Sequence, residues 1–298
     1  MNMNAGPLLL LCGNLLFATN GIWVTYAPQS ATPMTLAGFR MLIGAIFLIL
    51  WLKLSNKKFS LDGWNKGNIF LYSLGLWGFQ ICLFQSIRLV GMAVGVTIAI
   101  ASSPVFTAVL EKLIRRKSPA KIWYISTLIA VVGVGLLNPL NTGATDISLL
   151  LFPLGAGFCS AVTLIVGSRL STSSENSPEA AVTLVALVAF VLFMPFFFVN
   201  DVTWVFTTNG FVSIIMLGLV NCAIAYSLVI AGLRRTSASV SASIGLSEPM
   251  GAAVIGILFL GEPYTMQTIA GILCVLISVG LLLFGNKNTH TASVENNG

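Results

Sequence analysis

The chain has 298 residues, of which 56% are hydrophobic and 8% are charged, and its formal net charge is +6. Soluble domains carry roughly 25% charged residues, so this composition excludes a soluble globular protein and predicts an integral membrane protein. The basic residues lie in short gaps between apolar stretches, where they act as topology signals. The positive charge therefore does not predict a nucleic-acid partner.

Ten apolar stretches follow one another along the chain, each about 18 to 24 residues long and thus able to cross a bilayer as an α-helix. The loops between them are short and leave no room for a soluble domain. We predict an all-α integral membrane protein with spans at residues 5–26, 35–54, 67–87, 92–114, 119–138, 147–169, 179–199, 209–231, 237–260 and 264–284.

Lysine and arginine indicate the orientation of these spans. With the N-terminus inside the cell, 13 of the 15 basic residues lie on the cytoplasmic side, and Arg40 and Arg88 lie on the other. Ten spans return the chain to its starting side. We therefore expect a multi-pass protein of the plasma or inner membrane with both termini cytoplasmic and a disordered tail at residues 286–298.

The first predicted span contains Asn14 and Asn20 within apolar sequence. Helical spacing places Asn14, Phe17 and Gly21 on one face. Amide groups in hydrocarbon need hydrogen-bond partners, which either a hydrated cavity or a neighbouring helix can supply. Asn14 and Phe17 are candidates for a substrate cavity, and interhelical contact is the alternative.

Two further charged residues fall inside predicted spans. Arg40 lies only about 8 Å inside the outer end of the second span. We favour the interpretation that its side chain extends to the membrane interface, and the alternative is pairing with a carboxylate or an anionic substrate. Glu111, near the cytoplasmic end of the fourth span, is expected to reach water and to have a structural role.

The third and eighth predicted spans carry related side chains. Trp77, Gln80 and Phe84 form a stripe at helical spacing, and Asn221 and Tyr226 echo it at the corresponding position of the eighth span. Aromatic and amide groups together suit a cavity for a partly apolar solute. Such stripes are more often packing surfaces, and both interpretations stay open.

Glu248 and Pro249 lie in the middle of the ninth predicted span, after small residues that include the cavity candidate Ser243. A carboxylate about 16 Å into a span lies near the bilayer centre, where charge is costly and functional by default. Glu248 is predicted to contact a substrate ammonium group or to be a protonatable coupling group. The alternative is a neutral acid that hydrogen-bonds a neighbouring helix. Pro249 is expected to kink its helix.

The chain also contains an internal repeat. An offset of 145 residues places Pro249 on Pro104 and Gly280 on Gly135. Each copy has five spans, an odd number, so the second copy enters the membrane upside down relative to the first. We predict a five-plus-five inverted-topology repeat, with copies at residues 1–140 and 141–285, a shared cavity near the midplane, and a second kink at Pro104.

These features resemble the drug/metabolite transporter superfamily, in its EamA-type branch. The resemblance rests on the ten spans, the inverted repeat, Arg40, the run GLRRTSASVSASIGLSEP and the ending GEPYTMQTIAGILCVLISVGLLL. It implies a secondary transporter whose cavity is lined by the first, third and fourth spans of each half. Lys117 stands where such proteins often carry an acid.

The sequence thus favours a carrier that exports a small metabolite, such as an amino acid or a related amphiphile. Proton coupling through Glu248, exchange and facilitated diffusion stay open as its mode, and an uptake carrier or a channel is the alternative. The oligomeric state is open, and a monomer is plausible. An enzyme is disfavoured because the one histidine, His290, lies in the tail and no aspartate lies within a span. No metal or other cofactor is expected, since the five cysteines lie in apolar spans and behave as small hydrophobic residues.

Overall fold

The structure, a computed structural model, describes residues 5–56, 64–116, 118–137, 147–172, 177–259 and 265–285. These residues form helices and short loops, and none of them forms a β-strand. Nine helices in the described ranges are long and apolar enough to cross a membrane, and Lys121–Leu137 is a shorter apolar helix of 17 residues. The predicted all-α membrane fold is confirmed. The predicted tail at residues 286–298 lies outside the described residues.

Each of the ten predicted spans coincides with one or more helices of the structure. The first half contains α1 (Ala5–Ala18), α2 (Asn20–Tyr26), α3 (Pro33–Leu54), α4 (Lys66–Val90), α5 (Met92–Arg115) and α6 (Lys121–Leu137). The second half contains η1 (Ile147–Leu150), α7 (Leu151–Thr172), α8 (Pro178–Val199), η2 (Thr203–Phe206), α9 (Thr208–Met216), η3 (Leu217–Ala225), α10 (Tyr226–Leu233), α11 (Ala238–Gly245), α12 (Ser247–Phe259) and α13 (Met266–Gly285).

Short polar side chains fix where some of these helices begin. The hydroxyl of Thr32 accepts a hydrogen bond from the backbone N–H three residues later, and Pro33 is the first residue of α3. Ser177 and Pro178 start α8 in the same way. A hydroxyl at this position satisfies a free backbone donor, and proline has its φ angle preset for the first helical turn. The starts of α3 and α8 are therefore encoded locally.

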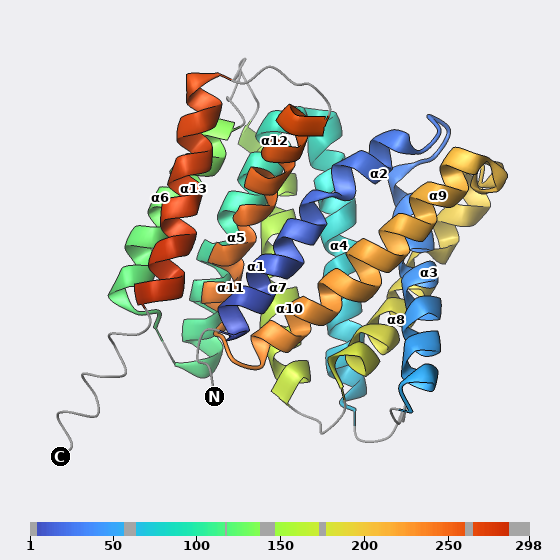
Figure 1. The fold of residues 1–298 in the computed structure, drawn as a ribbon, viewed down its shortest axis with the longest axis horizontal. Coiled ribbons are helices and arrows are strands. Elements are labelled where there is room, and N and C mark those ends of the chain that lie inside the picture. Colours follow the sequence, from blue (N-terminus) through green and yellow to red (C-terminus); the bar gives the residue numbers. More distant parts are fainter. Residues whose placement is uncertain are drawn as a thin grey trace.

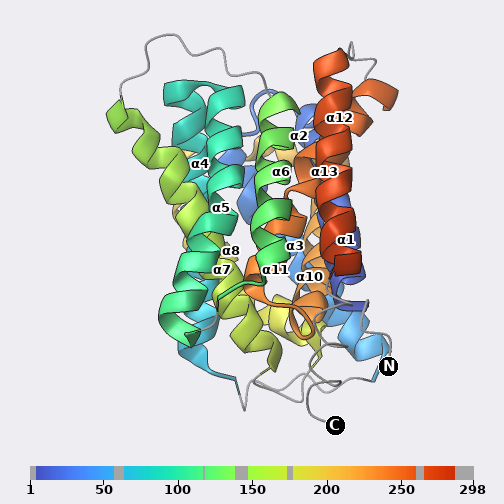
Figure 2. The same ribbon diagram turned by 90° about the vertical axis from the view of Figure 1, so that its left-hand side faces the viewer.

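The helices form one bundle with a helix pair toward each edge (Figure 1). α6 packs along α13 at one edge, and α3 packs along α8 toward the other. Between these pairs, α7 packs on α4 and α5, while α1 packs on η3, α10, α11 and α12. Figure 2 shows that α1 begins and α13 ends at the same end of the bundle. This end is the one that the charge distribution predicts to be cytoplasmic.

The helix contacts agree with the predicted repeat. Exchange of the two halves would turn the contact of α4 with α7 into that of α1 with η3 and α10, and both contacts are present. The same exchange relates the contact of α5 with α7 to that of α1 with α11 and α12. The inverted repeat and its boundaries stay predictions with which this pairing is consistent.

Besides the sixth span, which begins with the short 3-10 helix η1, three spans in the described residues are not continuous α-helices. The first is divided between α1 and α2 at Thr19, and the eighth contains η3, a π-helix of nine residues. The ninth is divided at Leu246, where α11 ends and α12 begins. Pro249 lies in the first turn of α12 and lacks the N–H that would bond the carbonyl of Gly245, so the break falls where proline favours it. α5 continues through Pro104 without a break, and the kink expected there stays a prediction.

Candidate substrate site

The polar groups of the first and eighth spans meet at the break in the first span. The carbonyl of Leu16 accepts hydrogen bonds from the N–H of Thr19 at 3.1 Å, from its hydroxyl at 2.7 Å and from Nδ2 of Asn221 at 3.0 Å. Helix breaks leave backbone groups without intrahelical partners, and these need replacements inside a membrane. Asn221, from the π-helix, therefore stabilises the break between α1 and α2.

Aromatic rings pack beside this junction. The rings of Phe17 and Tyr226 meet edge to face, with centroids 4.8 Å apart. Asn14, on the same helix as Phe17, is buried and donates its amide to the carbonyl of Leu10 at 2.7 Å. Its Oδ1 faces Gly245, at the end of α11, where an added Cβ would lie 3.6 Å away. The structure thus brings the candidates Asn14, Phe17, Asn221 and Tyr226 together.

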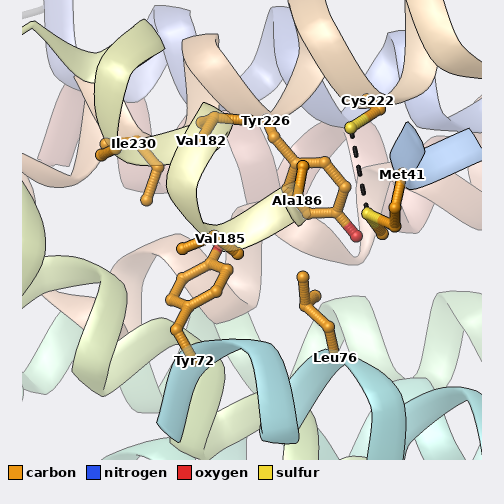
Figure 3. Close-up of a pocket in the computed structure, with 10 residues that line it drawn as sticks. Met41, Tyr72, Leu76, Val182, Val185, Ala186, Cys222, Tyr226 and Ile230 are labelled. Carbon is orange, nitrogen blue, oxygen red and sulfur yellow. Dashed lines mark hydrogen bonds between the residues drawn. The ribbon is translucent and has the colours of Figure 1, made fainter. Parts of the chain in front are cut away.

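Tyr226 also lines a small pocket. Figure 3 shows the phenol rings of Tyr72 and Tyr226 on opposite sides of this space, and the two groups interact electrostatically. The Sγ of Cys222 lies 3.9 Å from the Sδ of Met41 at its rim. The lining residues are Met41, Tyr72, Leu76, Ala181, Val182, Val185, Ala186, Cys222, Tyr226 and Ile230. These come from α3, α4, α8, η3 and α10, so both halves of the chain form the pocket.

Arg40 lies one residue before the pocket residue Met41. Its Nε is buried and has no hydrogen-bond partner among the described residues. Its charge acts on Glu248, on Tyr226 and on Cys222. The side chain as a whole is half-buried. These observations favour the alternative in which Arg40 acts inside the bundle, and its extension to the interface stays a prediction.

Glu248 occupies the first turn of α12, just after the break at Leu246. It is half-buried, and the neighbouring hydroxyl of Ser247 is buried without a hydrogen-bond partner in the described part of the chain. A carboxylate at a helix N-terminus is stabilised by the free N–H groups and the helix dipole. The break in the ninth span therefore creates a local environment suited to an anion at mid-membrane depth.

The sequence profile of the EamA-like transporter family matches this chain twice, at residues 4–138 and 147–284. The chain belongs to the EamA-like transporter family. Its similarity to individual proteins of known sequence agrees with this. The uncharacterized transporter YwfM of Bacillus subtilis (strain 168) is 31% identical over 95% of this chain and 94% of its own length.

Two exporters are more distant relatives of this EamA-like transporter. The threonine/homoserine exporter RhtA of Salmonella typhimurium (strain LT2) is 29% identical over 81% of this chain and 78% of its own length. The protein of the same name from Escherichia coli (strain K12) is 26% identical, over 87% and 84%. A solved crystal structure with 12% sequence identity has a TM-score of 0.82 and covers 94% of this chain and 98% of that one, which shows a shared fold.

The other predicted site residues of the EamA-like transporter lie away from the pocket. Trp77 and Phe84 pack against a cluster of α3 and α8 residues that includes Phe193, and Gln80 is half-buried on α4. Ser243 is buried and shares a hydrogen bond of 2.7 Å with Thr127 of α6. These contacts favour packing and interhelical roles, while substrate contact by Trp77, Gln80, Phe84 and Ser243 stays a prediction.

Glu111 corrects one sequence expectation. Its side chain is only 5% exposed, so it does not reach water as expected. It accepts hydrogen bonds from the N–H and the hydroxyl of Ser239, in the first turn of α11. The expected structural role agrees with this contact, because Glu111 joins α5 of the first half to α11 of the second.

Sequence reasoning missed two parts of the site in this EamA-like transporter. The π-helix around Asn221 contains no proline that could mark it in the sequence. Tyr72 was overlooked because a tyrosine in an apolar span looks like packing. Its spacing of four residues from Leu76 places these two side chains, which line the pocket together, on one face of α4.

Proposed function

We propose that this EamA-like transporter is a secondary carrier that exports a small amino acid or a related amphiphile by alternating access. The observation that carries the proposal is a pocket that both halves of the chain line, next to which Arg40 holds a buried Nε without a hydrogen-bond partner among the described residues. The charge of Arg40 also acts on Glu248 of the second half. The names of the RhtA relatives support export and support amino acids as the first substrates to test.

The energetics of membrane burial support a functional role for both charges. An acidic residue at the centre of a membrane helix costs about 2.5–3.5 kcal/mol on insertion scales, and an arginine nearer the end of its span, such as Arg40, costs less. Such residues are retained where they face a water-filled cavity, a substrate or each other. A carrier for a charged solute needs a polar site of this kind, whereas a purely structural bundle does not.

The three interrupted spans supply the flexibility that alternating access requires. Breaks at Thr19 and Leu246 and the π-helix η3 all lie in spans that pack on one another around α1. Discontinuous helices at mid-membrane are a common basis for transporter sites. We propose that the two halves are inverted repeats that rock around the site, and that Glu248 couples transport to protons.

The proposal includes the remaining properties of the carrier. It works in the plasma or inner membrane with both termini in the cytoplasm, its partners are the lipid bilayer and a small-molecule substrate, and it needs neither a cofactor nor a covalent reaction. A monomer is sufficient, because residues of one chain form the whole site.

Counterflow in proteoliposomes tests this function. Vesicles that contain the purified protein and are preloaded with unlabelled threonine or homoserine should accumulate the labelled amino acid transiently and with a saturable rate. Substitution Glu248→Gln should remove the acceleration by a pH gradient. Flux equal to that of empty vesicles would contradict the carrier, a rate that never saturates would indicate a pore, and an unchanged pH response in Glu248→Gln would remove the coupling assignment.

A further inference from the structure

Arg40 carries the one side-chain charge in the described ranges that acts on Glu248. No ion pair within 4.0 Å joins Arg40 to an acid in this part of the chain, and its buried Nε has no hydrogen-bond partner. An arginine inside a membrane bundle is stable only when it pairs or faces water. The guanidinium group of Arg40 therefore has a buried donor, Nε, that is available to bind a ligand.

The other acids of the described residues are engaged elsewhere. Glu111 accepts two hydrogen bonds from Ser239, and Asp201 accepts two from Thr203 in the loop after α8. Glu179 lies in the first turn of α8 and has its own partner. Among the described acids, Glu248 is therefore the one on which the charge of Arg40 acts, although no ion pair within 4.0 Å joins the two.

Tyr226 connects the charges with the pocket. Its phenol group is influenced by both Arg40 and Glu248, and its ring lines the pocket together with Tyr72. A solute with a carboxylate and an ammonium group would neutralise both protein charges at once. Its side chain would extend toward the pocket, whose lining surface is apolar and includes the rings of Tyr72 and Tyr226.

We propose that Arg40 binds the substrate carboxylate while Glu248 binds the ammonium group, so that the carrier selects zwitterions over amines and over carboxylic acids. This inference rests on the proposed function. Arginine suits the role because its planar fork matches the two oxygens of a carboxylate, which a lysine ammonium does not. Arg40 is thus a specificity-determining residue that the sequence alone assigned to the interface.

Three compounds that differ by one charged group test the assignment. Homoserine carries both groups, 3-aminopropan-1-ol lacks the carboxylate, and 4-hydroxybutanoate lacks the amine. Affinities are measured by titration of the purified full chain, with ligand-induced thermal stabilisation as readout, so that no transport cycle is needed. Wild-type protein should bind homoserine at least tenfold more tightly than either analogue.

The two charge-removing variants should both lose affinity for homoserine but keep affinity for different analogues. Arg40→Gln should bind homoserine at least tenfold more weakly, with unchanged affinity for 3-aminopropan-1-ol. Glu248→Gln should lose affinity for homoserine and keep its affinity for 4-hydroxybutanoate. Arg88→Gln is the matched control, because Arg88 is exposed on α4 and lies over the Phe84 ring, and it should change none of the three affinities.

The outcomes separate this inference from the proposed function. If wild-type protein binds no amino acid from a panel of all twenty and homoserine, the proposed function fails and this inference fails with it. A second outcome is that wild-type protein binds homoserine but Arg40→Gln lowers the affinities for homoserine and 3-aminopropan-1-ol equally, or leaves both unchanged. This outcome overturns only the role of Arg40. Should Arg40→Gln not fold, Arg40→Lys gives the same test. Loss of the planar guanidinium group should lower the affinity for homoserine alone. An equal loss of affinity for homoserine and 3-aminopropan-1-ol would overturn the role of Arg40.

Discussion

At the scale of single residues, the site depends on polar groups that replace backbone partners lost at helix breaks. Asn221 donates from the π-helix to the carbonyl of Leu16, which also accepts two hydrogen bonds from Thr19. The Oδ1 of Asn221 is buried without a partner in the described part of the chain. Asn221 therefore both fixes the position of η3 against α1 and leaves an acceptor beside the aromatic pair of Phe17 and Tyr226.

We expect Asn221→Ala to lower the free energy of unfolding by about 0.5–1 kcal/mol, the usual worth of an interhelical hydrogen bond in a membrane. The loss stays small because the Leu16 carbonyl keeps both hydrogen bonds from Thr19. Thermal unfolding in detergent measures the change, with Asn221→Gln as a conservative comparison. A decrease in the free energy of unfolding by several kcal/mol would show that Asn221 stabilises more of the bundle than the junction of α1 and α2.

At the scale of helices, glycine permits the close contact of α3 with η3. A Cβ at Gly44 would clash with Cys222, and one at Gly218 would overlap Ile43. Small residues let membrane helices approach closely enough for packing to stabilise them. Arg40 lies one turn before Gly44 on α3, so this close approach sets how near its helix lies to the eighth span.

Two glycine substitutions should therefore have opposite signs. Gly44→Ala should destabilise the protein and reduce transport, because the added methyl group would push α3 away from η3. Gly21→Ala, where a Cβ meets nothing within 4 Å, should stabilise α2 by up to about 1 kcal/mol through helix propensity. Melting temperatures of both variants check the contrast, and equal shifts would contradict the contact.

A second link between elements is the buried carboxylate of Glu111. Glu111→Ala removes the acceptor for two donors of Ser239 and should cost about 1–3 kcal/mol, since buried donors are left unsatisfied. Glu111→Gln keeps one acceptor oxygen and should cost less. Unfolding midpoints compare the two variants, and an unchanged midpoint for Glu111→Ala would show that the contact between α5 and α11 does not contribute to stability.

At the scale of the whole molecule, sequence patterns predicted the architecture better than the site. Span length and hydrophobicity are local properties, so each predicted span coincides with helix in the described residues. The ninth span is divided at Leu246, three residues before Pro249, and the kink expected at Pro249 itself stays a prediction. Arg40 was placed at the interface because depth along a helix says nothing about which neighbours its side chain meets. The π-helix depends on contacts with α1 and α3 that no local pattern encodes.

The predicted inverted topology can be checked on intact cells. Single cysteines at Ser118, before α6, and at Thr265, before α13, should be labelled from opposite faces of the membrane in a variant that lacks the five native cysteines. A membrane-impermeant maleimide should react with Thr265→Cys in intact cells and with Ser118→Cys only after the membrane is opened. Labelling of both positions from one face would contradict the inverted repeat.

The most direct test of the account is an experimental structure of the full chain with homoserine or threonine bound. We predict that the ligand lies beside Tyr226, with its carboxylate on the guanidinium group of Arg40, its ammonium group on Glu248 and its side chain toward the pocket lined by Tyr72. A ligand bound elsewhere in the bundle, or one that contacts neither Arg40 nor Glu248, would contradict the account.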